Sequence, residues 1–253
     1  MAVKNIALIF AGGSGERMAN ASTPKQFWKL QDKPVLAYTL EPFQVHREID
    51  GIVLAAPADW LDYCAEMAKR FHFGKLSAVV PGGSSGQESI FIGLKKVRQL
   101  YGEDTVVLIQ DGVRPLIDGA TITSCIRGVQ RYGSAVTVSP QTETVMLREP
   151  DKDSCRIVDR EKCLVGRAPQ CFWVRDIWEA HRRAEADRKG PFVDSASLME
   201  HYGYEIHPVM GPTENIKITT ALDFQIFCAV MEKRAGQKEK EPDGGVWAND
   251  PGE

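Results

Sequence analysis

The stretch 11-AGGSGER-17 and the lysine that follows at position 25 combine residue types that bind phosphate groups. Glycines let backbone N–H groups turn toward an anion without an intervening Cβ, and a following helix N-terminus adds partial positive charge. Arg17 can hold a phosphate with two parallel hydrogen bonds, while Lys25 acts as a point charge. The stretch matches neither GxGxxG nor the P-loop pattern, and its glycines alone also suit an ordinary strand-to-helix turn. The two cations favour a loop that holds a polyphosphate.

A second glycine-rich loop, 81-PGGSSGQES-89, also runs into a segment with a helical pattern. Its backbone amides and hydroxyl groups could contact a base or a ribose, and a flexible strand-to-helix connection is the alternative. In an open α/β sheet, ligands bind beyond the carboxyl ends of the strands. Two such loops after two predicted strands favour a nucleotide-binding edge.

Asp111 ends the strongly apolar run 105-TVVLIQ-110, which predicts that its carboxylate lies at the same edge. One carboxylate there suits Mg²⁺, which takes few protein oxygens and completes its coordination with substrate phosphates. A turn or helix-capping role is the alternative. Arg114 is either a ligand-binding residue or the partner of Asp111.

Lys217 lies in the otherwise apolar segment 215-NIKIT-219, which we interpret as a short strand before a helix. Because packing does not call for a lysine there, we expect it to bind a phosphate. An edge-strand lysine that protects against aggregation is the alternative.

The sequence shows no pattern typical of a covalent nucleophile. The five histidines lie in helical or surface contexts, and none follows a predicted strand beside a serine or cysteine. We interpret each as structural. The site is expected to work by positioning and charge neutralisation, as phosphoryl and nucleotidyl transfer do.

Composition narrows the class of protein. The formal net charge of −3 argues against a nucleic-acid binder, which ordinarily carries a basic surplus. The six cysteines form no CxxC pair, which argues against structural zinc. The chain shows neither a signal-peptide pattern nor an apolar run of transmembrane length. These features predict a cytoplasmic protein with reduced thiols and no membrane contact.

The elements that must position these residues alternate through the first half of the chain. Two segments, 59–71 and 88–101, place apolar residues at helical spacing. Five apolar runs are predicted to be buried parallel strands: 5–10, 51–56, 77–80, 105–110 and 134–138. The alternation predicts an α/β fold, a single Rossmann-like domain with a mostly parallel twisted sheet flanked by helices.

The segment 140–160 departs from this alternation. Apolar and polar residues alternate around the turn-like 149-EPDKDS-154, which predicts a β-hairpin that projects from the sheet as an arm. Because the arm is too small for a core of its own, we expect a second subunit to support it. A solvated loop on a monomer is the alternative.

Helical pattern returns over 174–188 and 194–203, with Asp194 as the expected N-cap and Gly203 as the stop. A strand over 204–209 and a last helix over 221–234 follow. We therefore predict one domain over residues 1–234. The remainder, 235–253, is polar and rich in glycine and proline, which predicts a disordered tail.

As an ordered set, these motifs resemble the cytidylyltransferases that act on polyol phosphates, namely methylerythritol 4-phosphate or ribitol 5-phosphate. The matching stretches are AGGSGERM, TPKQF, PGGSSGQESI, QDGVRP, VDR, APQCF, VDSASLMEHYG and NIKIT, colinear over roughly residues 4–234. The resemblance implies that CMP moves from CTP to a polyol phosphate with Mg²⁺, giving a CDP-polyol and pyrophosphate. It also implies a place in isoprenoid or cell-surface polymer biosynthesis.

The resemblance implies a role for each matching residue. Arg17 and Lys25 would stabilise charge on the pentavalent transition state, with Lys217 as a further catalytic cation, and Asp111 would lie near the metal. The nucleotide would be bound by Phe10, Ala11, Gly12, Gly13, Gly82, Gly83 and Ser89. The polyol phosphate would be bound by Asp111, Arg114, Thr144, Arg160 and Lys217. In this family the arm crosses to a second subunit, so a homodimer with shared sites is implied.

Two positions depart from the family pattern and bear on the substrate more than on the reaction. Gly86 stands where an arginine is usual, and Ala168 stands where the family has the threonine of Thr-Pro-Gln. The stretches 59-DW-60, 113-VRP-115 and 217-KITT-220 look closer to the ribitol enzymes, and 194–203 to the methylerythritol enzymes. A ribitol-type or related pentitol phosphate is therefore favoured by a small margin over methylerythritol 4-phosphate, which remains the runner-up. A transferase for another sugar phosphate or nucleotide, and a non-catalytic nucleotide-binding protein, are the alternatives.

Overall fold

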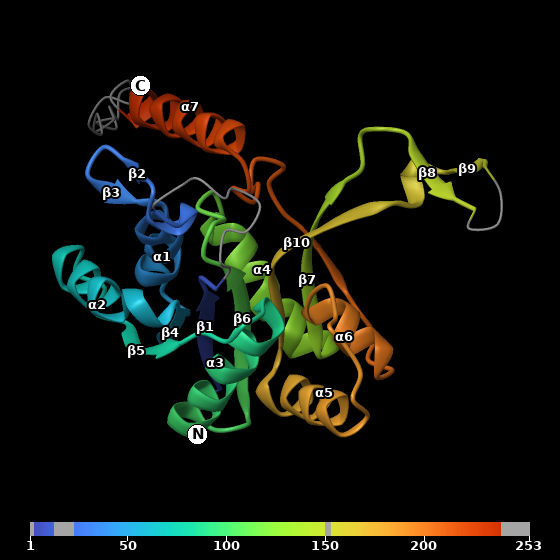
Figure 1. Cartoon of the computed structure of the whole chain (residues 1–253), viewed down its shortest axis with the longest axis horizontal. Helices are drawn as coiled ribbons and strands as arrows, with labels where there is room; N and C mark the ends of the chain where they lie inside the picture. Colours follow the sequence, from blue (N-terminus) through green and yellow to red (C-terminus); the bar gives the residue numbers. More distant parts are fainter. Residues whose placement is uncertain (1–2, 13–22, 150–152, 239–253) are drawn as a thin grey trace, which may run out of the picture. The chain divides into compact units, whose positions relative to one another are not determined.

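The computed structural model describes residues 3–12, 23–149 and 153–238, and within these ranges a seven-stranded sheet forms the centre of the fold (Figure 1). Strand β10 runs antiparallel to both β6 and β7, and the other neighbouring strands pair in parallel. The predicted mostly parallel α/β sheet is confirmed. In sheet order the strands are β11 (Pro208–Met210), β7 (Ser134–Pro140), β10 (Leu164–Trp173), β6 (Thr105–Asp111), β1 (Lys4–Phe10), β4 (Gly51–Ala56) and β5 (Leu76–Pro81).

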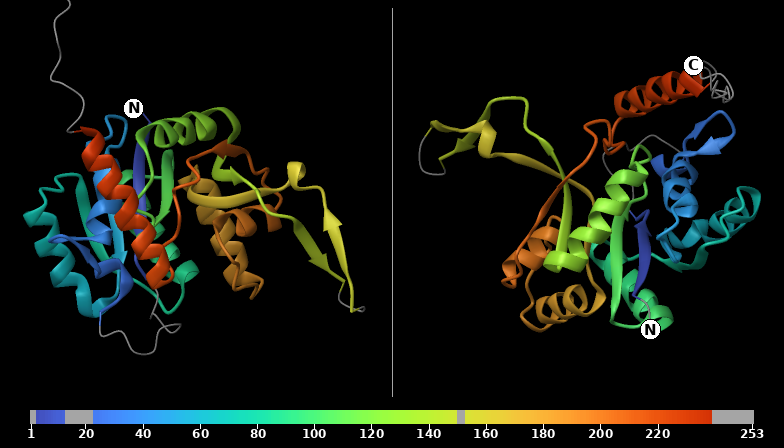
Figure 2. Two further views of the ribbon diagram at one scale, coloured as in Figure 1. Left: turned by 90° about the horizontal axis from the view of Figure 1, so that it is seen from above. Right: turned by 180° about the vertical axis from the view of Figure 1, so that it is seen from behind.

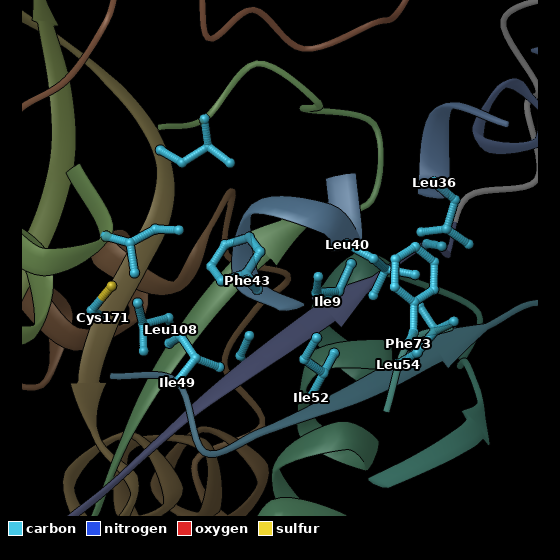
Figure 3. Close-up of a cluster of buried hydrophobic side chains, with 14 of the residues drawn as sticks. Ile9, Leu36, Leu40, Phe43, Ile49, Ile52, Leu54, Phe73, Leu108 and Cys171 are labelled. Carbon is cyan, nitrogen blue, oxygen red and sulfur yellow. The ribbon is translucent and has the colours of Figure 1, made fainter. Parts of the chain in front are cut away.

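Helices cover both faces of this sheet, which is why its central strands are apolar on both sides. One buried cluster takes side chains from α1, α2 and α4, and a second takes them from α3, α5 and α6. Successive residues of β1 alternate between the clusters: Ile9 lies in the first with Leu40 and Phe43 (Figure 3), and Leu8 lies in the second. The helices are α1 (Val35–Val45), α2 (Leu61–Arg70), α3 (Gly86–Tyr101), α4 (Gly119–Tyr132), α5 (Val174–Ala186) and α6 (Ser195–His201).

The predicted ends of α6 are confirmed. The Asp194 side chain accepts a hydrogen bond from the Ser197 backbone N–H at 2.8 Å, and the Ser197 side chain bonds back to the cap. Gly203, with φ of +85°, adopts the left-handed conformation that ends a helix after Tyr202. The segments predicted as helices over 59–71, 88–101 and 174–188 form α2, α3 and α5, the first preceded by the 3₁₀ turn η2 (Ala58–Trp60).

Three elements of the sheet layers were not predicted, namely α1, α4 and β10. Helix α1 carries Pro42 inside a stretch that is apolar on most sides, which hides its helical period. Helix α4 is rich in β-branched residues, although Asp118 caps it and Gly133 ends it in the left-handed conformation. Strand β10 contains Pro169 and changes register with β7 between Gly166 and Gln170, so its alternation is interrupted.

Two predicted strands are wrong in extent. The prediction over 204–209 is met only at Pro208–Met210, which pairs with β7 at the sheet edge. The segment 215–219 is not a strand. Asn215 explains the difference, because its side-chain amide donates to the Ala168 carbonyl at 2.7 Å and holds this segment by a side chain rather than by a backbone ladder.

The predicted arm is a hairpin of β8 (Val145–Arg148) and β9 (Cys155–Val158), paired antiparallel from Val145 opposite Val158. It forms a two-stranded sheet separate from the central one. The three views show it projecting away from the ends of β7 and β10 (Figures 1 and 2).

The chain divides into two compact units, Met1–Lys217 and Ile218–Glu253. The second contains α7 (Ala221–Lys238), preceded by a turn in which the Asp223 carboxylate accepts hydrogen bonds from the Thr219 and Thr220 backbone N–H groups. Helix α7 continues past the predicted end at residue 234, and 239–253 lie outside the described residues. None of the helices in the described ranges is long and apolar enough to cross a bilayer.

Candidate active site

The two glycine-rich loops meet at the side chain of Ser89. Ser89 lies in the first turns of α3 and is fully buried. Its hydroxyl donates to the Ser85 carbonyl at 2.8 Å and accepts from the Gly83 backbone N–H at 3.0 Å. Two predicted nucleotide-binding residues of the second loop are therefore joined by one hydrogen bond.

The first loop lies against the same hydroxyl. A Cβ built on Gly12 would be 2.5 Å from the Ser89 Oγ, and one built on Gly82 would be 3.0 Å from it. Because Oγ is held by two hydrogen bonds, it cannot move aside at low cost. A side chain at Gly12 would force Ser89 or the loop to move, and one at Gly82 would make a tight contact, so the two loops approach each other closely at the carboxyl ends of β1 and β5.

The strand register brings the first loop beside Asp111. Phe10 of β1 is paired with Asp111 of β6, and the Gly112 backbone N–H donates to the Phe10 carbonyl at 2.8 Å. Ala11, the next residue of the loop, is buried. Gly13 and Arg17, which were predicted to bind the nucleotide and to act in catalysis, lie outside the described residues.

Lys25 lies in the short 3₁₀ turn η1 (Lys25–Phe27), which is anchored to the first loop. The buried Gln26 donates from Nε2 to the Ala11 carbonyl at 2.8 Å. Phe27 stacks on Trp60 with ring centroids 4.1 Å apart. These contacts hold the turn that carries Lys25 beside the loop that begins at Ala11.

Asp111 is the centre of a compact charge cluster. Its Oδ1 contacts Lys217 Nζ at 2.6 Å and its Oδ2 accepts from Arg114 Nε at 2.8 Å. Burial alone would raise the pKa of the Asp111 carboxyl, but Lys217 and Arg114 outweigh it and hold that pKa below its ordinary value. Arg114 is thus the partner of Asp111, three residues away, and Lys217 is brought to this pair from a segment far apart in the chain.

Sequence reasoning missed two further residues of this cluster. The Asn215 carbonyl accepts from Arg114 Nη1 at 2.9 Å and from Arg167 Nη1 at 3.4 Å. Arg167 also donates from Nε to the Ser139 hydroxyl at 3.0 Å. Arg167, two residues before Pro169, belongs to no local sequence motif. Only the pairing of β10 with β7 brings it to the cluster around Asp111.

Asp111 is the residue of this cluster that can supply a ligand to Mg²⁺. A carboxylate offers about four lone-pair sites, and the two cations engage one on each oxygen, so Asp111 keeps capacity for a metal. In the described part of the chain, no three His, Cys, Asp or Glu side chains gather into a metal-binding group. The residues present fit Mg²⁺ as an ion that receives most of its ligands from a bound polyphosphate.

Two predicted substrate residues lie apart from this cluster. Thr144 and Arg160 flank the arm hairpin, and both are exposed. Arg160 Nη1 donates to the Thr142 carbonyl at 3.1 Å, which is a contact within the arm. The arm projects from the sheet (Figure 1), so in one chain these residues are not brought to Asp111.

The two positions that depart from the family pattern both lie near the predicted site residues. Gly86 is the first residue of α3, and a Cβ there would meet Phe10 at an ordinary 3.6 Å. A Cβ at that position therefore makes only an ordinary contact. Ala168 is buried, and its carbonyl is the acceptor for Asn215.

In chemical terms, the edge of the sheet offers backbone amides and cations, with one ionised carboxylate. Such a set binds and orients anionic groups and stabilises charge that develops on them. None of the six cysteines is bonded in a disulfide, and the buried His181 lies on α5 against Phe91 rather than at this edge.

Comparison with known proteins gives a family match over most of the chain. Residues 5–233 match the family model described as 2-C-methyl-D-erythritol 4-phosphate cytidylyltransferase (IspD). The chain is 45% identical over 228 residues to a ribitol-5-phosphate cytidylyltransferase of Vibrio parahaemolyticus, covering 90% of this chain and 96% of that protein. It is 43% identical over 234 residues to the Streptococcus agalactiae protein of the same name, covering 92% and 98%.

A second group of relatives bears the other substrate name. A 2-C-methyl-D-erythritol 4-phosphate cytidylyltransferase of Clostridium botulinum is 35% identical over 230 residues, covering 91% of this chain and 98% of that protein. The crystal structure of a protein of that name from Thermus thermophilus superposes with a TM-score of 0.70 at 27% identity, covering 92% and 100%. A 4-diphosphocytidyl-2C-methyl-D-erythritol synthase of Anaerococcus prevotii shares the fold, with a TM-score of 0.79 at 24% identity, covering 91% and 99%.

Proposed function

The chain belongs to the 2-C-methyl-D-erythritol 4-phosphate cytidylyltransferase (IspD) family, and within that family we propose that its substrate is ribitol 5-phosphate. It is a nucleotidyltransferase that moves CMP from CTP to a polyol phosphate. The observation that carries the choice of polyol is the difference in identity. Relatives named for ribitol 5-phosphate are 43–45% identical, against 34–35% for relatives named for methylerythritol phosphate, over similar shares of the chain.

In the proposed reaction, an oxygen of the polyol phosphate attacks the α-phosphorus of CTP. A new P–O bond forms as the bond from the α-phosphorus to the bridging oxygen breaks, and pyrophosphate leaves with that oxygen. Lys25 and Arg17 are proposed to stabilise the negative charge of the pentavalent transition state. The closeness of the Lys25 turn to the loop after β1 supports this role for Lys25.

Nucleotide binding is assigned to the two loops joined by Ser89. The loop at Phe10–Gly12, continued by Gly13, is proposed to hold the triphosphate, and because the Ala11 N–H is already bonded to the Ala55 carbonyl at 2.7 Å, the backbone amides that follow Ala11 are the proposed donors. Gly82, Gly83 and Ser89 are proposed to contact the base and ribose. The absence of room for a Cβ at Gly12 and Gly82 supports close approach of the two loops.

Mg²⁺ is the proposed cofactor, held by Asp111 together with the phosphates of CTP. When bound, the ion neutralises phosphate charge and orients the reacting group. Asp111 itself is kept ionised by Lys217 and Arg114, so it is ready to accept a cation. Removal of divalent ions by a chelator should abolish turnover, and added Mg²⁺ should restore it.

A homodimer formed through the arm is proposed to complete the site. Thr144 and Arg160 lie on the arm and away from Asp111 of their own chain, so they would serve the site of a second subunit. The arm also exposes Met146, Leu147 and Ile157, which are 60%, 47% and 68% exposed. Apolar side chains on an isolated hairpin are typical of a surface that a partner covers.

The test is a panel of polyol phosphates with CTP and Mg²⁺, scored by pyrophosphate release. We expect kcat/KM for ribitol 5-phosphate to exceed that for methylerythritol 4-phosphate by at least about tenfold, a difference of about 1.4 kcal/mol in transition-state binding. The reverse order would contradict the proposed substrate. Lys25→Ala should lower kcat by about a hundredfold or more; turnover within a few-fold of wild type would contradict the proposed role of Lys25.

We also propose that the enzyme acts in the cytoplasm. All six cysteines are free thiols, as expected where thiols stay reduced.

A further inference from the structure

The charges around Asp111 do not balance. One carboxylate, that of Asp111, directly contacts two cations, Lys217 and Arg114. A third cation, Arg167, approaches the same group, because Arg167 and Arg114 both donate to the carbonyl oxygen of Asn215. Three positive charges and one negative charge leave this cluster with a net charge of +2.

Arg167 is the member of the cluster without an acidic partner. Its hydrogen bonds go to the neutral Ser139 hydroxyl and to the Asn215 carbonyl, and among the described residues it forms no ion pair. Burial and the nearby charge of Arg114 both lower the pKa of the Arg167 guanidinium. A partly buried charge beside a like charge is costly unless something else compensates for it, and such arrangements concentrate at binding sites.

Contacts with neighbouring strands hold the Arg167 side chain in a defined position. It lies on β10 directly before the buried Ala168, whose carbonyl accepts from Asn215 Nδ2 at 2.7 Å. Ser139, the partner of Nε, lies on the neighbouring strand β7. The guanidinium is therefore held between two strands and the segment that carries Lys217, while three of its five N–H donors remain available.

The charge and shape of this cluster match a phosphate monoester. Such a group carries about −1.5 to −2 at neutral pH, so it is attracted to these four side chains, whose own net charge without a metal ion is +2. A planar guanidinium with free donors suits the oxygens of a phosphate, which it can bind with two parallel hydrogen bonds. Ribose hydroxyls or a cytosine base would neutralise none of this charge, and the triphosphate of CTP is assigned to the loop after β1, which leaves the phosphate of the polyol as the anion proposed for this cluster.

We propose that Arg167 binds the phosphate group of the polyol phosphate, beside Arg114 and Lys217, and so determines the affinity for that substrate and not for CTP. This inference rests on the proposed function for the identity of the polyol, but the anion site stands on the geometry of the described residues. A purely structural role, in which Arg167 only ties Ser139 to Asn215, is the alternative that an experiment must separate.

The experiment compares wild type with Arg167→Gln and Arg167→Lys, and with Arg175→Gln as a matched control. Arg175 lies just after the opposite end of β10 and pairs with Asp104 on the surface. KM for ribitol 5-phosphate and KM for CTP are measured separately by pyrophosphate release. We expect Arg167→Gln to raise KM for the polyol phosphate by about tenfold or more, with KM for CTP within twofold of wild type.

Two control variants and a competition measurement make the result specific to Arg167. Arg167→Lys should recover part of the affinity because it restores the charge, and Arg175→Gln should leave both KM values unchanged. Inorganic phosphate should compete with the polyol phosphate, and Arg167→Gln should weaken that inhibition in parallel. An unchanged KM for the polyol phosphate in Arg167→Gln would overturn the inference. So would a common rise of both KM values together with a lower Tm, because that is the result of a structural role.

Failure of the proposed function gives a different result. If wild type prefers another polyol phosphate, the same comparison is made with that substrate, and Arg167 is judged by its KM. If wild type turns over none of the panel, calorimetry with inorganic phosphate alone tests the site. Weaker phosphate binding by Arg167→Gln than by Arg175→Gln then supports the inference, and equal binding by the two contradicts it.

Discussion

Ser89 illustrates, at the scale of one residue, how a neutral side chain can organise a charged site. Its hydroxyl carries no charge to offer a nucleotide, yet it joins the two loops that are proposed to bind one. The residue is buried, and both of its hydrogen bonds go to backbone groups within the second loop and the start of α3. Its contribution is therefore to hold backbone amides in place.

The tight fit at Gly12 leads to a prediction. In Gly12→Ala the new Cβ would lie 2.5 Å from the Ser89 Oγ, so the loops must separate. We expect a loss of about 1–3 kcal/mol in the free energy of unfolding, as in overpacked interiors, and weakened CTP binding. Gly86→Ala is the matched control, because its Cβ would make an ordinary contact at 3.6 Å. Urea denaturation and CTP calorimetry measure both effects; equal stability of the two variants would contradict the prediction.

His181 leads to a pH prediction. It is 3% exposed, its Nε2 has no hydrogen-bond partner within the described part of the chain, and burial lowers its pKa from 6.5 to about 4. Between these pH values the unfolded chain binds a proton that the folded chain does not, so stability falls as the pH falls below 6.5. We expect protonation linked to His181 to lower the free energy of unfolding by about 2 kcal/mol between pH 7 and pH 5.

Comparison with His181→Phe isolates this contribution, because phenylalanine keeps an aromatic ring against Phe91 and does not titrate. The free energy of unfolding, measured by urea at several pH values, should decline less steeply in the variant than in wild type. Parallel declines in the two proteins would show that His181 does not titrate as described.

At the scale of elements, short turns rather than long helices bring the proposed catalytic residues to the sheet. Lys25 lies in a 3₁₀ turn of three residues, which cannot be stable by itself. Its stability comes from side chains: Gln26 bonds to the first loop, and Phe27 packs against Trp60 and Tyr63. Trp60 and Tyr63, which follow β4 in the chain, therefore support the turn through their contacts with Phe27.

This support predicts that Trp60 affects catalysis without contacting substrate. In Trp60→Ala the ring stacked on Phe27 is lost, which should cost about 1 kcal/mol or more in stability and lower kcat by about tenfold as the turn loosens. Trp60→Phe keeps an aromatic ring and should retain most of the activity. Steady-state kinetics with pyrophosphate release measures the effect, and a wild-type kcat in Trp60→Ala would rule out this positioning role.

At the scale of the whole molecule, the arm is the feature that a single chain leaves unexplained. Most side chains of its two strands are exposed. Met146 and Ile157 lie directly opposite each other in the hairpin, and they are 60% and 68% exposed. Residues opposite each other in an antiparallel pair lie on the same face. Two large apolar side chains therefore lie side by side and exposed on one face of the arm, which is consistent with the proposed second subunit.

The arm predicts the oligomeric state. Sedimentation velocity should show a dimer for wild type and a monomer after deletion of residues 142–157. The double substitution Met146→Asp and Ile157→Asp should weaken the dimer without removing the hairpin. Arg156→Gln, at the position opposite Leu147, is the control and should remain dimeric. A monomeric wild type would remove the shared-site proposal, and a dimeric deletion variant would place the interface elsewhere.

The sequence by itself was sufficient to predict the fold class, the β-arm and the glycine-rich and charged segments that follow the strands. These features depend on local signals: apolar runs that form β1, β4 and β6, glycines that precede α3, and an aspartate at the end of a buried strand. Each signal is contained within a few neighbouring residues, so it can be read without knowing what packs against it.

Only the tertiary structure decided which of these residues meet. The pairing of Asp111 with Lys217, the position of Arg167 beside Arg114, and the hydroxyl of Ser89 between two loops all join segments distant in sequence. The same holds for β10, whose interrupted pattern becomes a strand because β6 and β7 pair with it. The local sequence pattern indicates the conformation that a segment favours. Contacts between distant segments depend instead on sheet order and register, which no single segment encodes.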